Sequence, residues 1–196
     1  MKFSDKLQGA WADSGSMLCV GLDPQLDRLP DSVRRTKYPF FEFNRRVIDA
    51  TLPHACAYKP QFAYYAGENR LPELQMTMDY LRETAASRLT ILDGKRGDIG
   101  STADQYAREA FEVYGADAVT VNPYMGGDTL LPFTQFADKG VVVLCKTSNP
   151  GSAELQDLKM DTGNPLFLEV AERAAREWNG NNNLSTGTTC AGAGDF

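Results

Sequence analysis

Short apolar runs alternate with longer amphipathic segments along most of this 196-residue chain. The apolar runs lie at residues 17–23, 56–65, 89–95, 116–124 and 141–148, and the amphipathic segments at residues 40–55, 69–85, 100–115, 128–140 and 163–178. Five strand–helix units in series predict an α/β fold with a parallel sheet, because parallel strands need a crossover between them. Such a sheet is either open and doubly wound or closed as a (β/α)8 barrel.

Polar residues gather at the carboxyl end of nearly every predicted strand. They are Asp23, Lys59, Asp93 with Lys95, Asn122 and Ser148. In a barrel these ends converge on one mouth, where active sites lie. The chain has neither GxGxxG after a strand nor GxxxxGK[ST], so the usual nucleotide-binding open sheets lose support. We therefore favour a (β/α)8 TIM barrel, of which this chain supplies about the first five to six strand–helix units.

Composition narrows the class of protein further. The chain is 42% apolar and 23% charged, which is typical of a globular domain. Its net charge of −6 argues against bulk binding of nucleic acid. No apolar run approaches the roughly 20 residues of a membrane helix, and residues 1–16 contain no apolar signal-peptide core. The four cysteines are scattered without CxxC spacing, so we expect no zinc site or disulfide framework and a cytoplasmic protein.

The predicted strand at residues 89–95 leads into an unusual group of charges. Asp93, Lys95, Arg96 and Asp98 occupy four of six consecutive positions. Charges at the end of an apolar strand are costly to desolvate unless they are paired. Side chains alternate along a strand, so Asp93 and Lys95 are expected to share a face. The group is either a salt-bridge cluster that closes the barrel or an active site that holds ammonium groups among carboxylates.

Four segments in order resemble one enzyme family. The segment LDGKRGDIGST at residues 92–102 has the D-x-K-x-x-D-I-x-x-T pattern of the orotidine 5′-monophosphate decarboxylases. Three further segments resemble other strand ends of that family: VGLDP at 20–24, YKPQFAYY at 58–65 and TSNPGS at 147–152. Their sequences are most similar to those of the longer bacterial (type 2) subfamily. The resemblance runs from about residue 15 to about residue 184. It implies a (β/α)8 barrel, in agreement with the order of elements.

The resemblance also implies a reaction and a set of roles. The family converts orotidine 5′-monophosphate to uridine 5′-monophosphate and CO2, the last step of de novo UMP biosynthesis, without a metal or organic cofactor. Lys95 is similar to the family's proton donor, and Asp93, Lys59 and Asp98 would complete an alternating charge array. Substrate-binding roles are implied for three further residues: Asp23 at the ribose, Ser148 at the pyrimidine edge, and Thr102. Asp98 and Thr102 would reach the active site of a partner subunit, which implies a homodimer with shared sites.

Two other functions remain open at this point. Sugar-phosphate decarboxylases and hexulose-phosphate synthases of the same superfamily share the D-x-K-x-x-D core but generally use a metal ion. Lys59 and the isoleucine that follows Asp98 favour the orotidine enzyme. The second alternative is a non-catalytic fragment that retains part of the fold.

Residues 179–196 differ in composition from the rest of the chain. They are rich in Gly, Asn, Ser and Thr, which favours a loop or disorder. Relatives continue with further strand–helix units that carry the phosphate-binding loop and its arginine. We therefore divide the chain into a partial barrel at residues 1–178 and an atypical tail at residues 179–196. We expect a truncated or altered decarboxylase whose activity is impaired or absent.

Overall fold

A computed structural model of the chain describes residues 1–189, and within them six parallel strands form one sheet. The strands are β1 (Leu18–Leu22), β2 (Ala55–Pro60), β3 (Leu89–Arg96), β4 (Ala118–Val121), β5 (Gly140–Thr147) and β6 (Leu184–Thr189). Each strand pairs with the next one along the chain, from β1 to β6. A doubly wound sheet would reverse its strand order at a switch point. The sequential order is that of a (β/α) barrel, so the predicted fold class is confirmed.

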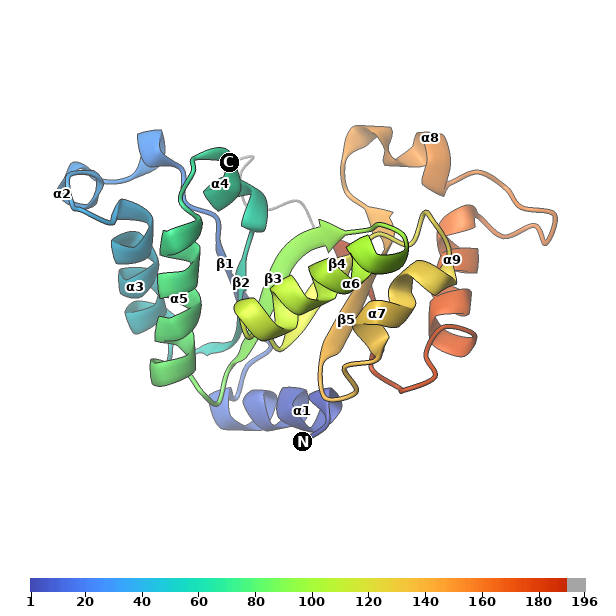
Figure 1. Cartoon of the computed structure of the whole chain (residues 1–196), viewed down its shortest axis with the longest axis horizontal. Helices are drawn as coiled ribbons and strands as arrows, with labels where there is room; N and C mark the ends of the chain where they lie inside the picture. The colour runs from blue at the N-terminus through green and yellow to red at the C-terminus, as the bar shows by residue number, and fades with distance from the viewer. Residues whose placement is uncertain (190–196) are drawn as a thin grey trace.

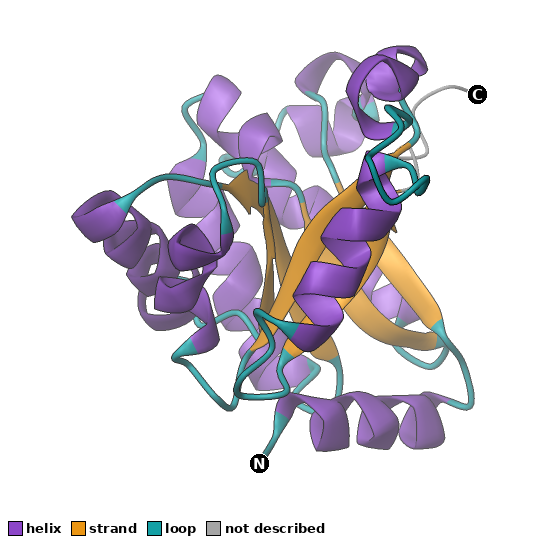
Figure 2. Cartoon of the chain, turned by 90° about the vertical axis from the view of Figure 1, so that its right-hand side faces the viewer, coloured by secondary structure: helices purple, strands orange, loops and turns teal. Residues whose placement is uncertain are grey.

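Helices connect the strands and cover the outside of the sheet (Figures 1 and 2). The longer helices are α1 (Phe3–Ser14), α3 (Pro39–Thr51), α5 (Leu71–Thr84), α6 (Gly100–Arg108) and α9 (Leu166–Arg176). The shorter α-helices are α2 (Asp31–Arg34), α4 (Phe62–Gly67), α7 (Leu131–Thr134) and α8 (Ala153–Gln156). The 3-10 turns are η1 (Leu26–Arg28), η3 (Gly127–Leu130) and η4 (Pro150–Ser152), and a π-helical turn, η2 (Glu109–Val113), continues α6. None of the helices in residues 1–189 is long and apolar enough to cross a membrane.

Helix α1 closes the amino-terminal end of the sheet, and the sequence patterns did not predict it. It runs across the bottom of Figure 1, below the starts of the strands. Its apolar side chains Phe3, Leu7 and Trp11 pack against a buried group formed by Ala10, Cys56, Ala57 and Leu89. Gly140, at the start of β5, leaves room for the Phe3 ring, because a Cβ there would lie 2.6 Å from it. The helix therefore seals the end of the sheet opposite the charged strand ends.

A buried carboxylate joins helix α5 to the start of α3. Glu73 Oε2 accepts hydrogen bonds from the backbone N–H groups of Phe40 and Phe41, at 2.8 and 3.1 Å. These donors lie in the first turn of α3, where a helix offers them no acceptor of its own. Glu73 Oε1 accepts a hydrogen bond from Arg70 at 2.5 Å, and the Glu73 residue is only 4% exposed. Both carboxylate oxygens are thus satisfied in a buried position.

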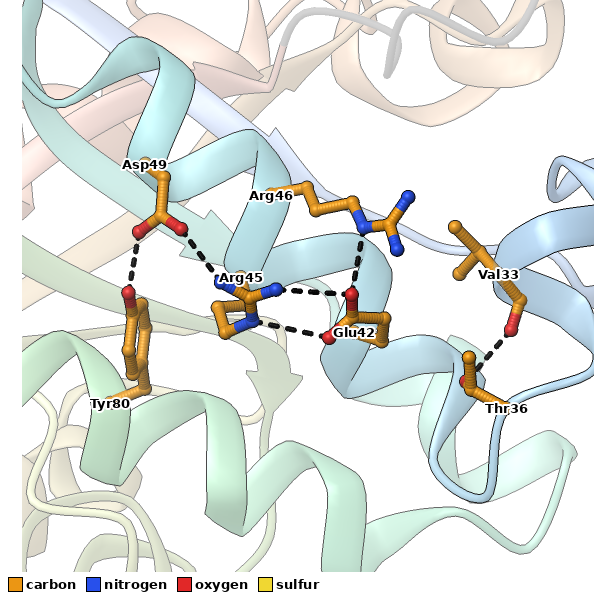
Figure 3. Close-up of polar contacts among 7 residues, drawn as sticks. All are labelled: Val33, Thr36, Glu42, Arg45, Arg46, Asp49 and Tyr80. Carbon is orange, nitrogen blue, oxygen red and sulfur yellow. Dashed lines mark hydrogen bonds and ion pairs between the residues drawn. The ribbon is translucent and has the colours of Figure 1, made fainter.

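An exposed set of ion pairs lies on the outer side of the same two helices (Figure 3). Arg45 donates two hydrogen bonds to Glu42, at 3.0 and 3.1 Å, and Arg46 donates one at 2.7 Å. Arg45 also pairs with Asp49 at 3.0 Å, and the Tyr80 hydroxyl of α5 donates to the same carboxylate. Solvent screens pairs of this kind, so each contributes about 1 kcal/mol or less to stability.

The two glutamates give a matched test of burial. We expect Glu73→Ala to lower the free energy of unfolding by about 3 kcal/mol, because it leaves the N–H groups of α3 and the Arg70 guanidinium without their acceptor. Glu42→Ala removes a partly exposed carboxylate whose arginine partners reach solvent, and it should cost about 1 kcal/mol or less. Urea denaturation of both variants measures the difference. Equal losses would contradict the capping role of Glu73.

The strand predicted at residues 56–65 is shorter than expected. β2 ends at Pro60, and residues Phe62–Gly67 form helix α4 instead. The aromatic residues of this segment favour a strand locally. In the fold, however, Tyr65 is fully buried and donates a hydrogen bond to the Leu22 carbonyl at 2.9 Å. Packing against the core therefore overrides the local preference.

The prediction of loop or disorder for the segment after residue 178 was wrong for residues Leu184–Thr189, which form β6 beside β5. The asparagines before this strand build a defined turn. Asn183 Nδ2 lies 3.0–3.1 Å from the carbonyl oxygens of Thr134, Phe136 and Lys139. Asn179 Oδ1 accepts a hydrogen bond from the backbone N–H of Leu184 at 2.8 Å. Composition indicated a loop because it does not reveal that the edge of β5 is available for pairing. Residues 190–196 lie outside the described part of the chain.

Candidate active site

Asp93, in the carboxyl-terminal half of β3, is the centre of the charged group. Its residue is 3% exposed, and both of its carboxylate oxygens accept two hydrogen bonds. Oδ1 accepts from Lys95 Nζ at 2.7 Å and from Thr120 Oγ1 at 2.8 Å. Oδ2 accepts from Lys59 Nζ at 2.8 Å and from Gln61 Nε2 at 3.2 Å. The structure therefore brings the predicted residues Lys59, Asp93 and Lys95 into one array, which is held by two residues that the sequence analysis missed.

Lys95 lies on β3 with Asp93, and the two neighbouring strands supply the other three donors. Lys59 lies near the end of β2, Gln61 directly follows that strand, and Thr120 lies on β4. Gln61 and Asp93 form a parallel bridge that continues the pairing of β2 with β3. Polar side chains at the carboxyl ends of three adjacent parallel strands must meet at the same edge of a barrel. Gln61 lies two residues after Lys59 within the run predicted as a strand, and Thr120 is the only hydroxyl in β4, so nearness to the polar strand ends was the signal that could have identified both.

Lys95 reaches Asp93 through an irregularity in β3 rather than through simple strand alternation. Leu92 pairs with Val119, but Arg96 pairs with Val121, so β3 contains two extra residues at this point. Lys95 has φ of +45°, in the left-handed region that side chains with a Cβ rarely adopt. Its backbone N–H donates to Thr120 Oγ1 at 2.9 Å. Such strain costs on the order of 1–3 kcal/mol and persists where the surroundings impose it, as they do in many functional sites.

The charges of the array stabilise each other. Burial alone would raise the pKa of Asp93, but the hydrogen bonds from Lys59 and Lys95 outweigh it and lower that pKa. Burial alone would lower the pKa of Lys59, but its hydrogen bond and attraction to Asp93 raise it. Asp93 and Lys59 are therefore both held in their charged forms at neutral pH.

Asp23 follows β1 and lies close enough to this array to interact with its charges. Burial raises the pKa of Asp23, the positive charge of Lys59 opposes that shift, and the negative charge of Asp93 adds to it. Asp23 Oδ1 is buried and accepts no hydrogen bond from the described residues. A buried acceptor without a donor is unfavourable on its own, so this oxygen is suited to accept a hydrogen bond from a hydroxyl group.

Asp98 and Thr102 do not join the array of their own chain. Asp98 Oδ1 accepts a hydrogen bond from the backbone N–H of Ile99 at 2.8 Å, and within residues 1–189 no hydrogen bond or ion pair joins Asp98 to the array. Thr102 is exposed in the first turn of α6, within the helix. The side chain between them, Ile99, is 62% exposed. These three residues therefore form an outward-facing segment next to the site.

Ser148 is exposed in the loop that follows β5. Two hydrogen bonds hold the preceding residue, Thr147, to helix α8. Gln156 accepts a hydrogen bond from the Thr147 N–H and donates one to the Thr147 hydroxyl, both at 2.8 Å. A cavity of about 610 Å³ lies between this loop, the end of β4 and helix α9. Its lining includes Asn122, Tyr124, Thr147, Gln156 and Phe167. Asn122, directly after β4, therefore lines this cavity, whose lining does not include Lys59, Asp93 or Lys95.

The described residues contain no group of three or more His, Cys, Asp or Glu side chains arranged to hold a metal ion. The charged side chains of the array instead neutralise each other. The two ammonium groups held by the Asp93 carboxylate can stabilise negative charge that develops beside them, and Lys95 can deliver a proton.

Comparison with known proteins identifies the family. A model of the "Orotidine 5'-phosphate decarboxylase / HUMPS family" matches residues 16–193. The chain belongs to this family. It is 49% identical over 185 residues to the orotidine 5′-phosphate decarboxylase of Cellvibrio japonicus, covering 93% of this chain and 67% of that protein. The corresponding enzyme of Ralstonia pickettii is 50% identical over 179 residues, covering 91% of this chain and 66% of that protein. The chain thus spans about two thirds of the length of these family members.

Solved structures of family members have the same fold. Leishmania donovani OMP decarboxylase superposes with a TM-score of 0.81 at 40% identity, covering 95% of this chain and 70% of the other. Leishmania donovani UMP synthase gives a TM-score of 0.83 at 40% identity, covering 95% of this chain and 39% of the other. The resemblance seen in the sequence motifs therefore extends to the backbone of nearly the whole chain.

The lowered pKa of Asp93 predicts how the array contributes to stability as the pH changes. A carboxyl group whose pKa is lowered by folding stabilises the fold above its unfolded pKa, about 3.9 for Asp, and loses that effect as the pH falls through the folded value. We expect Asp93→Asn to lower the free energy of unfolding by about 3 kcal/mol at pH 7, because it leaves two ammonium groups without their counter-ion.

The free energies of unfolding of Asp93→Asn and of the unaltered chain should become more similar as the pH falls below about 4. Urea denaturation of both proteins between pH 7 and pH 3 measures these energies. A difference that stays constant over this range would show that the charge of Asp93 does not contribute to stability.

Proposed function

We propose that this chain decarboxylates orotidine 5′-monophosphate to uridine 5′-monophosphate and CO2, the last step of de novo UMP synthesis, in the cytoplasm. The observation that carries the proposal is the array in which Lys95 and Lys59 both bind the buried Asp93 carboxylate. The relatives named orotidine 5′-phosphate decarboxylase at 49–50% identity support the same reaction.

The reaction leaves negative charge where the substrate cannot spread it. When the bond between C6 and the carboxyl carbon breaks, CO2 leaves as a neutral molecule and the electron pair stays on C6. That pair occupies an sp² orbital in the plane of the ring, so the π system does not delocalise it. The Lys95 ammonium stabilises the developing carbanion electrostatically and then donates its proton to C6. Lys95 is left neutral and regains a proton from solvent.

Asp93 serves this chemistry in two ways. It anchors the Lys95 ammonium at 2.7 Å, which keeps the proton donor in one position. In this proposal the carboxylate of the substrate also approaches the Asp93 carboxylate. Two like charges about 4 Å apart repel by about 4 kcal/mol at an effective dielectric of about 20, and this repulsion disappears as CO2 leaves. The preorganised position of Lys95 contributes the larger part, because the array is already formed before the substrate binds.

Other residues are assigned to binding the substrate. Asp23 accepts a hydrogen bond from a ribose hydroxyl, which is supported by its buried and unpartnered Oδ1 near the array. Ser148 binds the edge of the pyrimidine from the loop after β5, which is supported by its exposed position next to the anchored Thr147. In this arrangement the nucleotide lies across the ends of β1 to β5.

We further propose that the active site is shared between two copies of the chain. Asp98 and Thr102 lie on an outward-facing segment, and in the described part of the chain neither forms a hydrogen bond or ion pair with the array. A second copy placed against this segment would receive Asp98 beside its Lys95 and Thr102 beside its substrate. The exposed Ile99 between them supports such a contact, because exposed apolar side chains are suited to be buried in an interface.

Replacement of Lys95 tests the proposed chemistry. We expect Lys95→Ala to lower kcat for orotidine 5′-monophosphate by at least about 1,000-fold, because it removes both the proton donor and the positive charge at C6. Loss of substrate absorbance follows the reaction. Lys37→Ala, at an exposed lysine, is the matched control and should retain full activity.

Retention of a tenth of the activity by Lys95→Ala would exclude Lys95 as the donor. The assay is run with EDTA and again with added magnesium. Activity that disappears with EDTA and returns with magnesium would move the protein to the metal-dependent sugar-phosphate enzymes of its family.

Mixing two inactive variants tests the shared site. Heterodimers of Lys95→Ala and Asp98→Ala subunits contain one site with both residues intact. Statistical mixing should therefore restore about a quarter of the activity, since half of the dimers then have one of two sites working. Lys95→Ala mixed with Asp93→Asn is the matched control, because both changes damage residues that each subunit supplies to its own site. No recovery in the first mixture, with heterodimers shown to be present, would contradict a shared site.

A further inference from the structure

We infer that Arg96 is a positioning residue that fixes Lys95 on one side and the segment carrying Asp98 on the other. The inference rests on the proposed function of Lys95. Arg96 directly follows Lys95 in the chain and is the last residue of β3. It was the one charge of the group at residues 93–98 for which neither the array nor the family pattern gave a role.

The Arg96 side chain is enclosed by two aromatic rings and a carboxylate. Its guanidinium carbon lies 4.1 Å from the centre of the Phe62 ring and 4.7 Å from the centre of the Tyr106 ring. Arg96 Nε and Nη2 lie 3.0 and 2.8 Å from Glu109 Oε2. The side chain is 17% exposed. A planar guanidinium that stacks on two rings and pairs with a carboxylate has little freedom to move, and a lysine cannot reproduce these contacts.

The backbone of Arg96 marks the end of the irregular part of β3. The register with β4 resumes at Arg96, opposite Val121, after the two extra residues. The Arg96 carbonyl accepts a hydrogen bond from the Asn122 N–H at 2.7 Å. Lys95, immediately before it, has the strained φ of +45°. A strained residue keeps its conformation only if its neighbours restrain it. Arg96, which directly follows Lys95, restrains the backbone of Lys95 from its carboxyl-terminal side.

The partners of Arg96 come from segments that also serve the array. Phe62 opens helix α4 and directly follows Gln61, which donates a hydrogen bond to Asp93. Tyr106 belongs to α6, the helix that begins two residues after Asp98. One side chain therefore links the strand of Lys95 to the element beside Asp93 and to the helix that follows Asp98.

The partner carboxylate lies on an unusual backbone turn. Glu109 begins the π-helical turn η2, and its carbonyl accepts a hydrogen bond from the N–H of Tyr114 at 3.0 Å. The Tyr114 ring packs edge-on against Phe62, with ring centres 6.1 Å apart. Turns of this kind are rare and often occur at functional sites. Here the turn places Glu109 at the guanidinium, and Tyr114, directly after the turn, packs against the Phe62 ring.

The contact between β3 and β4 continues past Arg96. A Cβ on Gly97 would lie 3.0 Å from the Asn122 carbonyl oxygen, so the chain passes close to the end of β4 before it reaches Asp98. Movement of Arg96 would therefore displace the residue on each side, Lys95 toward its own site and residues 97–98 toward the outward-facing segment. A residue that only stabilised the fold would have no selective effect on these two positions.

The experiment compares four variants of the full chain. Arg96→Met removes the charge but keeps much of the side-chain length, Arg96→Lys keeps the charge, and Glu109→Gln leaves Arg96 in place without its counter-ion. Arg108→Met is the matched control. Arg108 is the last residue of α6, and it forms an ion pair with Glu112 at 3.0 Å that is exposed to solvent. Kinetics with orotidine 5′-monophosphate and thermal unfolding are measured for each.

We expect Arg96→Met to lower kcat by about 30-fold or more with KM changed less than about threefold, since small displacements of a catalytic group have effects of this size. Arg96→Lys should recover only part of the loss, and Arg108→Met should behave as the unaltered chain. Glu109→Gln should lower kcat by a smaller factor. If Arg96→Met does not fold, this variant tests the positioning role of Arg96 in its place. A kcat within about threefold of the unaltered chain in every folded Arg96 and Glu109 variant would overturn the inference.

A chemical measurement separates this inference from the proposed function. Reductive methylation followed by mass spectrometry gives the reaction rate of each lysine without any need for turnover. Lys95 should be methylated at least about fivefold faster in Arg96→Met and Glu109→Gln than in the unaltered chain, while Lys59 keeps its rate. Lys59 binds the same carboxylate and reports any general loosening of the array.

If the unaltered chain shows no decarboxylation, the proposed function fails, and the methylation rates alone decide the role of Arg96. Rates for Lys95 that do not change, or that rise together with those of Lys59, would show that Arg96 is structural only.

Discussion

The structure depends on one buried carboxylate that must be neutralised where it lies. Asp93 lies buried in the carboxyl-terminal half of β3, and its two oxygens accept four hydrogen bonds, two of them from ammonium groups. An uncompensated charge in that position would cost several kcal/mol. The requirement fixes the ends of β2, β3 and β4 relative to one another, because each strand must deliver its donor to the same pair of oxygens. Stability and the candidate chemistry thus rest on the same contacts.

Much of this arrangement was predictable from the sequence. The alternation of apolar runs and amphipathic segments predicted a parallel sheet, and polar residues at the strand ends indicated a common mouth. Lys59 and Asp93 meet because neighbouring strand ends converge in any barrel of this kind, whereas Lys95 reaches Asp93 through the irregularity in β3. These are properties of periodicity and topology, which a sequence records directly.

Other features depend on tertiary contacts that a sequence records only weakly. The irregularity at Lys95 could not be predicted, because a left-handed backbone is imposed there by Thr120 and by the neighbouring strand. Helix α1 carries only a few apolar side chains, which match a surface created by β2 and β3. β6 was missed because asparagine and threonine are typical of loops until an unpaired strand edge lies beside them. In each case the deciding partner is distant in the chain.

The position of α1 has a practical consequence for handling the protein. Met1 is 87% exposed, whereas Phe3 is packed against the start of β5. The helix covers the amino-terminal ends of the strands, and the charged array lies toward their carboxyl-terminal ends. A tether or affinity tag joined before Lys2 would therefore leave the molecule with its mouth directed away from the attachment surface. On a sensor chip or a resin, this geometry presents the array to the solution and keeps the linker away from small molecules that enter it.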